Sequence, residues 1–173
     1  MVLAGVGVRR LTPHLDDRGL FVELFRAEWD AGPAPVQWNA VRSSANVLRG
    51  VHVHRRHHDY LMVAAGTLLL GLHDLRADSP TSGLSAQLTL SAEDPIAVTI
   101  PPGVCHGFYF PEPTVHVYAV SEYWDLDDEL GCRFDAAELG LNWPIGDPLL
   151  SPRDRAAGSY EAMRMAYADV GAP

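Results

Sequence analysis

The sequence contains no lysine: all 13 basic residues are arginine, against 22 aspartates and glutamates in 173 residues. This absence excludes mechanisms that depend on a lysine amine, such as Schiff-base chemistry and phosphate-binding P-loops. The net charge of −9 argues against nucleic acid as a partner, because a nucleic-acid surface requires a basic face. A small anionic ligand stays compatible with the sequence, since a few arginines in one cleft can override an acidic average.

Cysteines and long apolar runs are also scarce. Cys105 and Cys132 form no CxxC motif, and we expect both to be reduced thiols of a cytoplasmic protein. No apolar run reaches the roughly 20 residues of a membrane span, and "MVLAGVGVRR" lacks the features of a secretory signal, so we expect no membrane segment. The length, the 47% apolar content and the lack of repeats or low-complexity linkers predict one domain over residues 1–173.

Short apolar segments separated by turn residues run along most of the chain. Their spacing of about 8–12 residues is typical of an all-β sandwich or barrel. The expected strands are 20–26, 36–41, 47–54, 60–75 (two strands with Gly66 at the turn), 84–90, 96–101, 106–110 and 115–124. Alternation in the last segment places His116, Tyr118 and Val120 on one face. The tail, residues 151–170, predicts one terminal helix opened by Ser151 and Pro152.

Four of the eight histidines fall within seven positions of "RGVHVHRRHHDYLMVAAG" (49–66). His52 and His54 are two residues apart in a strand, so both side chains project from one face. His57 and His58 lie in the loop that follows, and we expect them to be exposed and without function. In "IPPGVCHGF" (100–108) a Pro-x-Gly turn presents His106 at the start of the next strand. Taken singly, these histidines are also compatible with a polar strand surface or a packed core.

Together, the two histidine stretches resemble the two signature motifs of the cupin superfamily, whose small β-barrels hold a site in the lumen. The resemblance implies an all-β, cupin-type double-stranded β-helix (a jelly-roll barrel) with short C-terminal helices. In metal-binding cupins the positions matching His52, His54, Asp59 and His106 are ligands, and such a set suits Fe(II), Mn(II), Ni(II) or Zn(II). Those cupins usually carry glutamate at the position of Asp59.

A more specific resemblance covers residues 16–154. The segments "DDRGLFVELF" (16–25), "VQWNAVRSSANVLRGVH" (36–52), "IPPGVCHGF" (100–108), "VYAVSEYWDLDDE" (117–129), "LGLNWP" (139–144) and "LLSPRD" (149–154) occur in this order. The same order of landmarks resembles the dTDP-4-dehydrorhamnose 3,5-epimerase family of sugar-nucleotide cupins. The resemblance implies an isomerase that needs no cofactor and epimerises a dTDP-4-keto-6-deoxyhexose at C3 and/or C5 in deoxysugar biosynthesis. It also implies a homodimer, with an N-terminal strand placing Arg18 or Phe21 in the partner's cleft.

The resemblance implies a role for each matching residue. His52 matches the general base, Asp154 the carboxylate that orients it, and Tyr118 the acid on the opposite side of the sugar ring. Positions matching the nucleotide and substrate cleft are Arg18, Gln37, Asn39, Arg49 and Glu129, with Phe21, Glu23, His106 and Tyr123 as further pocket positions. These roles are chemically sound, because a histidine with a carboxylate behind it removes a proton next to a ketone near neutral pH.

The chain departs from this family at four points, one of which is a shortened loop between His52 and Asp59. Asp59 stands where the family carries a lysine that stabilises the enolate oxygen, His54 replaces a glutamine, and Ala40 replaces a histidine. Losing one preorganised charge at a developing oxyanion costs about 2.7–4 kcal/mol. Besides a divergent epimerase, three alternatives stay open: a dTDP-4-keto-6-deoxyhexose 3,4-ketoisomerase, a metal-dependent cupin enzyme of secondary metabolism, and a non-catalytic sugar-binding cupin.

Overall fold

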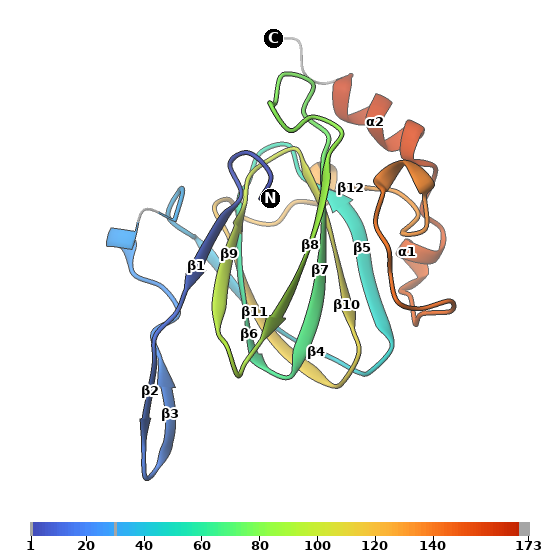
Figure 1. The fold of residues 1–173 in the computed structure, drawn as a ribbon. Coiled ribbons are helices and arrows are strands. Elements are labelled where there is room, and N and C mark those ends of the chain that lie inside the picture. Colours follow the sequence, from blue (N-terminus) through green and yellow to red (C-terminus); the bar gives the residue numbers. More distant parts are fainter. Residues whose placement is uncertain (1, 30, 170–173) are drawn as a thin grey trace.

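Two antiparallel five-stranded sheets face each other in the computed structural model, which describes residues 2–29 and 31–169 (Figure 1). The first sheet has the order β1-β9-β6-β11-β4 and the second β12-β5-β10-β7-β8. The strands of the first sheet are β1 (Gly7–Arg10), β9 (Ile96–Ile100), β6 (Asp59–Ala65), β11 (Thr114–Val120) and β4 (Gln37–Ser43). Those of the second are β12 (Leu130–Gly131), β5 (Val47–Val53), β10 (Val104–Phe110), β7 (Thr67–Asp74) and β8 (Ser85–Ser91).

The core between the sheets follows from the period of two along each strand. In β6, Leu61 and Val63 point inward, whereas Tyr60 and Met62 belong to a separate cluster on the outer face. Every second residue of β7 joins the inner core, namely Leu68, Leu70 and Leu72. Such alternation explains why each sheet buries one face against the other.

The C-terminal part of the chain covers the outer face of the second sheet, beside β5 in Figure 1. It contains the 3₁₀ turns η2 (Leu126–Asp128) and η3 (Ala137–Leu139) and the helices α1 (Pro152–Arg155) and α2 (Tyr160–Ala168). Met163 of α2 packs on Cys105 and Cys132 in this cluster. Both cysteines are buried free thiols, as expected.

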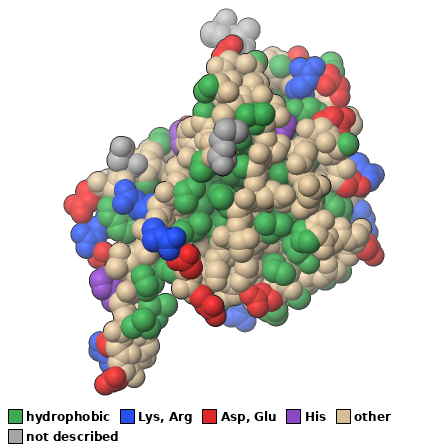
Figure 2. Space-filling model, in the orientation of Figure 1, with side chains coloured by type: hydrophobic (Ala, Val, Ile, Leu, Met, Phe, Trp, Pro, Cys, Tyr) green, Lys and Arg blue, Asp and Glu red, His purple; other side chains and the backbone are tan. Residues whose placement is uncertain are grey.

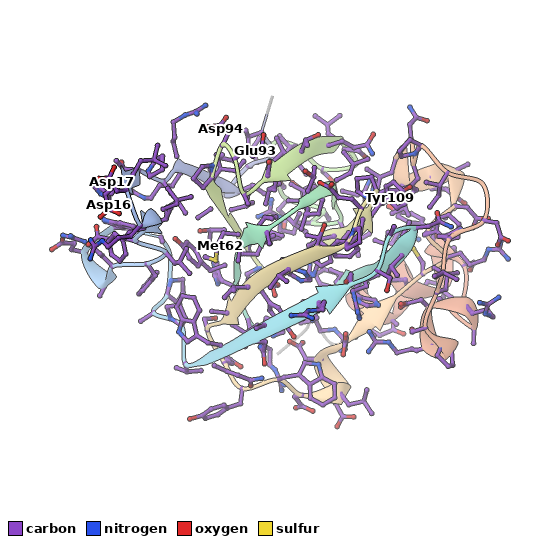
Figure 3. The ribbon with its side chains drawn as sticks, turned by 90° about the horizontal axis from the view of Figure 1, so that it is seen from below. Asp16, Asp17, Met62, Glu93, Asp94 and Tyr109 are labelled. Atoms are coloured by element: carbon purple, nitrogen blue, oxygen red, sulfur yellow. The ribbon has the colours of Figure 1, made fainter. Side chains whose placement is uncertain are left out.

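An N-terminal hairpin of β2 (Pro13–Asp16) and β3 (Gly19–Val22) projects away from the sheets (Figure 1). In Figure 3, Asp16 and Asp17 mark its tip, far from the C-terminal helices. Apolar side chains are visible along this arm in Figure 2, and Leu15, Leu20 and Phe21 are all more than half exposed. The 3₁₀ turn η1 (Ala27–Trp29) follows the hairpin.

The structure confirms the expected all-β jelly roll and the turn at Gly66, whose φ is +80°. The prediction of one terminal helix over residues 151–170 is wrong, because the segment forms two helices, each with its own serine at the N-cap. The Ser159 hydroxyl accepts a hydrogen bond from Ala162 N, and Gly158 just before it disfavours a continuous helix. Val170 lies outside the described residues.

The N-terminal strands differ from the expectation. The strand expected at 20–26 ends at Val22, and β1 and β2 were not anticipated. In the described part of the chain, no helix is long and apolar enough to cross a membrane.

Candidate active site

A cavity of about 320 Å³ is lined by side chains from both sheets and from the start of α1. Of the residues singled out in the sequence, it gathers His52, Tyr118, Asp154, Arg49, His54, Asp59, His106 and Glu129. β5 and β10 contribute His52 and His106, which are register partners. β6 and β11 contribute Asp59 and Tyr118 from the facing sheet.

His52 and Asp154 form a hydrogen-bonded pair. His52 Nε2 lies 2.7 Å from Asp154 Oδ1, although the two residues are 102 positions apart. The short helix α1 holds the carboxylate, because the Ser151 hydroxyl accepts from Asp154 N at 3.0 Å and donates to Oδ2 at 2.9 Å. Burial opposes ionisation of Asp154, but the hydrogen bond from His52 and nearby charge lower the pKa of this carboxyl overall. When Nε2 of His52 donates to the ionised Asp154, Nδ1 is the basic nitrogen. Arg153 Nη2 lies 2.9 Å from Nε2 and 3.4 Å from Nδ1.

Glu129 and Arg153 border the same imidazole. Glu129 Oε1 accepts from Arg153 Nη2 at 2.7 Å and lies 3.5 Å from His52 Nδ1, while Oε2 accepts from Trp124 Nε1 at 2.8 Å. Gly131 faces His52 from the neighbouring strand, where an added Cβ would lie 3.1 Å from His52 Cδ2. The His52 imidazole is thus enclosed on several sides by specific neighbours.

Tyr118 lines the cavity from the sheet opposite His52. Burial, followed by the negative charges of Asp59 and Glu129, raises the pKa of the Tyr118 phenol. The phenol is therefore protonated at neutral pH and is able to donate a proton. His116 stacks on it with ring centroids 6.1 Å apart.

Asp59 lies in a group of buried histidines beside His52. Burial raises the pKa of Asp59 to about 7, and burial lowers the pKa of His54 to about 2 and that of His106 to about 4. The His54 ring lies between two other histidine rings: its centroid is 4.0 Å from that of His57 and 5.1 Å from that of His106. Both His54 and His106 are neutral at physiological pH.

Six residues expected from the resemblance lie outside the cavity. Gln37 and Asn39 are hydrogen-bonded to each other on edge strand β4, and Tyr123 is exposed. Arg18, Phe21 and Glu23 lie on or just after the hairpin, where Arg18 pairs with Asp16 and Glu23 with Arg26. Their roles at a cleft remain predictions.

Several residues of the cavity wall are not identified from the sequence, and two of them, His57 and Arg153, carry polar groups next to the expected site. His57 was expected to be exposed, which is wrong: it is only 3% exposed and lines the cavity. One feature of the sequence points to its burial: His57 is two residues before Asp59. If the strand that starts at Asp59 is extended back to His57, both side chains lie on the same face. Arg153 precedes Asp154 in α1, and its contact with Glu129 depends on tertiary structure.

The metal set expected from cupin motifs is altered. His52 is hydrogen-bonded to Asp154. Among the described residues, the cluster of possible metal ligands within 4.8 Å of one another consists of His54, His57 and Asp59. His106 remains next to this group, with Nε2 3.9 Å from Asp59 Oδ2. His57 therefore takes the place that the sequence assigned to His52.

A jelly-roll barrel in which a histidine of one sheet pairs with an aspartate of helix α1, and a protonated tyrosine lies on the other sheet, defines a cupin-type enzyme with groups suited to proton transfer. Residues 1–162 match the sequence model of the dTDP-4-dehydrorhamnose 3,5-epimerase family. The chain belongs to this family, whose members are isomerases acting on carbohydrates.

Individual relatives agree with this assignment. An enzyme of that name from Pseudomonas aeruginosa is 36% identical over 84% of this chain and 85% of its own. One from Neisseria gonorrhoeae is 34% identical over 88% of this chain, which spans only 50% of that relative's length. The structure of ChmJ, a 3'-monoepimerase from Streptomyces bikiniensis in complex with dTDP-quinovose, is 28% identical. It superimposes with a TM-score of 0.87 over 96% of this chain and 90% of that one.

Proposed function

We propose that the chain epimerises a dTDP-4-keto-6-deoxyhexose at C3, at C5 or at both, in deoxysugar biosynthesis. The observation that carries this proposal is the placement of the His52–Asp154 pair and Tyr118 on opposite walls of one cavity. Similarity to both a 3,5-epimerase and a 3'-monoepimerase supports epimerase chemistry and leaves the number of inverted centres to experiment.

The proposed reaction consists of two proton transfers. His52 Nδ1 removes the proton from a carbon next to the C4 ketone, and the electron pair of that C–H bond moves to the ketone oxygen as an enolate. Tyr118 then donates its phenolic proton to the same carbon from the other side, which inverts the centre. General acid–base help of this kind contributes about 10²–10⁴-fold to the rate. Neither transfer requires a redox cofactor.

Arg49 supplies positive charge for an anionic substrate. Its side chain lines the cavity and donates through Nε to Ser43 Oγ at 3.1 Å. The remaining guanidinium nitrogens are suited to a phosphate or a nucleobase carbonyl, which a planar fork binds well. We therefore propose Arg49 as a substrate-binding residue.

Replacing His52 tests the base directly. We expect His52→Asn to reduce turnover of a dTDP-4-keto-6-deoxyhexose at least ~100-fold, because the only proposed base is lost. The matched control is His58→Gln, a nearby half-buried histidine that does not line the cavity. Circular dichroism and thermal melting establish that both variants fold. Unchanged turnover in His52→Asn would overturn the assignment.

We further propose that residues 1–173 act as one domain in a cytoplasmic homodimer. The projecting hairpin with its exposed Leu15, Leu20 and Phe21 supports the dimer, because an apolar arm of this kind is stabilised by covering it. In such a dimer Arg18 and Phe21 would reach the partner's cleft. The buried free thiols of Cys105 and Cys132 support a reducing compartment.

A further inference from the structure

Three buried imidazoles in the cavity wall are held through the same ring nitrogen. His54 Nδ1 lies 3.3 Å from the Asp128 carbonyl oxygen, and His106 Nδ1 lies 3.2 Å from the Val104 carbonyl oxygen. His57 Nδ1 lies 3.2 Å from the Asp128 carboxylate. Because the two carbonyl oxygens accept hydrogen bonds, Nδ1 of His54 and of His106 carries the proton, and Nε2 of each presents a lone pair. An oxygen behind each Nδ1 is the arrangement that orients metal-binding histidines.

Asp59 completes this group with a carboxylate. It is 6% exposed, and its Oδ2 lies 3.8 Å from His57 Nε2 and 3.9 Å from His106 Nε2. These separations are too long for hydrogen bonds. Two donors bound to one ion at about 2.1 Å each lie about 3–3.5 Å apart, so these two contacts of Asp59 need to shorten by about half an ångström. The ligand atoms of His54, His57 and Asp59 all lie within 4.8 Å of one another.

We propose that His54, His57 and Asp59 bind a divalent first-row transition-metal cation in the cavity wall, with the neighbouring His106 as a fourth ligand. Three imidazoles and one carboxylate suit Zn(II), Fe(II), Mn(II) or Ni(II). The cavity supplies the path of entry, since all four side chains line it.

The proposed position gives the cation a role in the reaction, and this part rests on the proposed function. Tyr118 of β11 pairs with Leu61 of β6, and Asp59 lies two residues before Leu61 in the same strand. Asp59 and Tyr118 therefore lie on the same face of the sheet, one strand pair apart. A cation bound there would place positive charge near the enolate oxygen, at the position where the resemblance expects a lysine. The chain has no lysine to supply that charge. The competing reading is a metal-free site in which a protonated Asp59 donates a hydrogen bond to the enolate.

Metal titration of the chain, purified without an affinity tag and stripped with a chelator, tests the site. Isothermal titration with Zn²⁺, Mn²⁺ and Ni²⁺, and visible absorption of the Co²⁺ form, report binding without any substrate. We expect one ion per chain. Asp59→Asn and His57→Gln should each weaken binding at least ~100-fold, whereas the control His58→Gln should leave the affinity unchanged. Melting curves establish that each variant folds.

Two outcomes would overturn the metal site: no stoichiometric binding of any of these ions by the folded chain, or equal binding by Asp59→Asn, His57→Gln and the unmodified chain. Failure of the metal-site proposal can be distinguished from failure of the epimerase proposal. Full epimerase activity in a chain that binds no metal would reject the metal site alone. Stoichiometric binding with no proton exchange on the sugar would reject the epimerase alone.

Discussion

At the scale of single residues, the phenol of Tyr118 separates proton removal from inversion. In Tyr118→Phe the base His52 is intact, so a proton can still leave the sugar, but no acid on the opposite wall returns one. We expect product formation to fall ~10²–10⁴-fold while substrate protons continue to exchange with solvent deuterium. Product assays and mass spectrometry of recovered substrate measure the two rates. Loss of both rates in parallel, or of neither, would contradict the assigned role of Tyr118.

Asp74 is the residue whose ionisation contributes most clearly to stability. The carboxylate is fully buried and accepts hydrogen bonds from Arg76 Nε at 2.8 Å, Ser79 Oγ at 2.5 Å and Thr81 Oγ1 at 2.6 Å. Burial alone would raise the pKa of Asp74, but these hydrogen bonds outweigh it and hold the pKa well below the usual value. The stabilisation is therefore present above about pH 4 and is lost as the pH falls through the lower pKa of the folded state.

Asp74→Asn should reduce the free energy of unfolding at pH 7 by about 2–3 kcal/mol, the scale of a hydrogen bond to a charged group. The difference from the unmodified chain should shrink as the pH falls below about 4. Urea unfolding at pH 7 and at pH 3 measures it, with the exposed Asp78→Asn as a control from the same loop. A difference that stays constant between the two pH values would contradict the pKa direction.

The individual site residues differ in how far the sequence predicts them. Strand alternation and the histidine motifs predict that His52, Tyr118 and His106 share an interior. Asp154 lies 102 residues from His52, so their contact follows from the family resemblance and not from any local pattern. His57 was missed because "RRHHD" has the composition of an exposed loop, whereas its imidazole is buried by contact with Asp128 of a distant turn.

At the scale of elements, the short strand β12 lies against the base. Gly131 pairs with His52, and an added Cβ would lie 2.8 Å from the Val51 carbonyl oxygen and 3.1 Å from His52 Cδ2. Gly131→Ala should therefore displace the imidazole and lower kcat by about 10–100-fold. Steady-state kinetics with melting curves check this, and Gly146→Ala is the control because nothing lies within 4 Å of its added Cβ. Equal kcat values in both variants would contradict close packing at β12.

The strands could be predicted from the sequence more readily than the ends of the chain. Segments of the two sheets alternate between inner and outer faces, so several of them carry a period of two, as in β4 and the first part of β11. The hairpin strands β2 and β3 carry no such signal, because all but one of their residues are exposed. The C-terminal helices are too short to show a helical period, and two closely spaced serine caps resemble one helix in the sequence.

At the scale of the whole molecule, the projecting hairpin predicts association. Phe21 is 62% exposed on an arm that projects away from the two sheets (Figure 1). We expect the unmodified chain to be a dimer and Phe21→Asp to shift it toward monomer, because burying an unpaired carboxylate at an interface is costly. Size-exclusion chromatography with light scattering measures the mass. Met165→Asp, at an exposed apolar residue of α2, is the control. A dimer that persists in Phe21→Asp, or a monomeric unmodified chain, would contradict the arm's role.

Solvent deuterium exchange tests the central claim most directly: that the His52–Asp154 pair and Tyr118 move protons on a 4-keto sugar. The unmodified chain is incubated in D₂O with a dTDP-4-keto-6-deoxyhexose, and deuterium at C3 and C5 is followed by NMR. We predict deuterium at C3, at C5 or at both, with inversion at each labelled centre, and none in His52→Asn. An active, folded chain that binds the nucleotide sugar but introduces deuterium at neither carbon would contradict the claim.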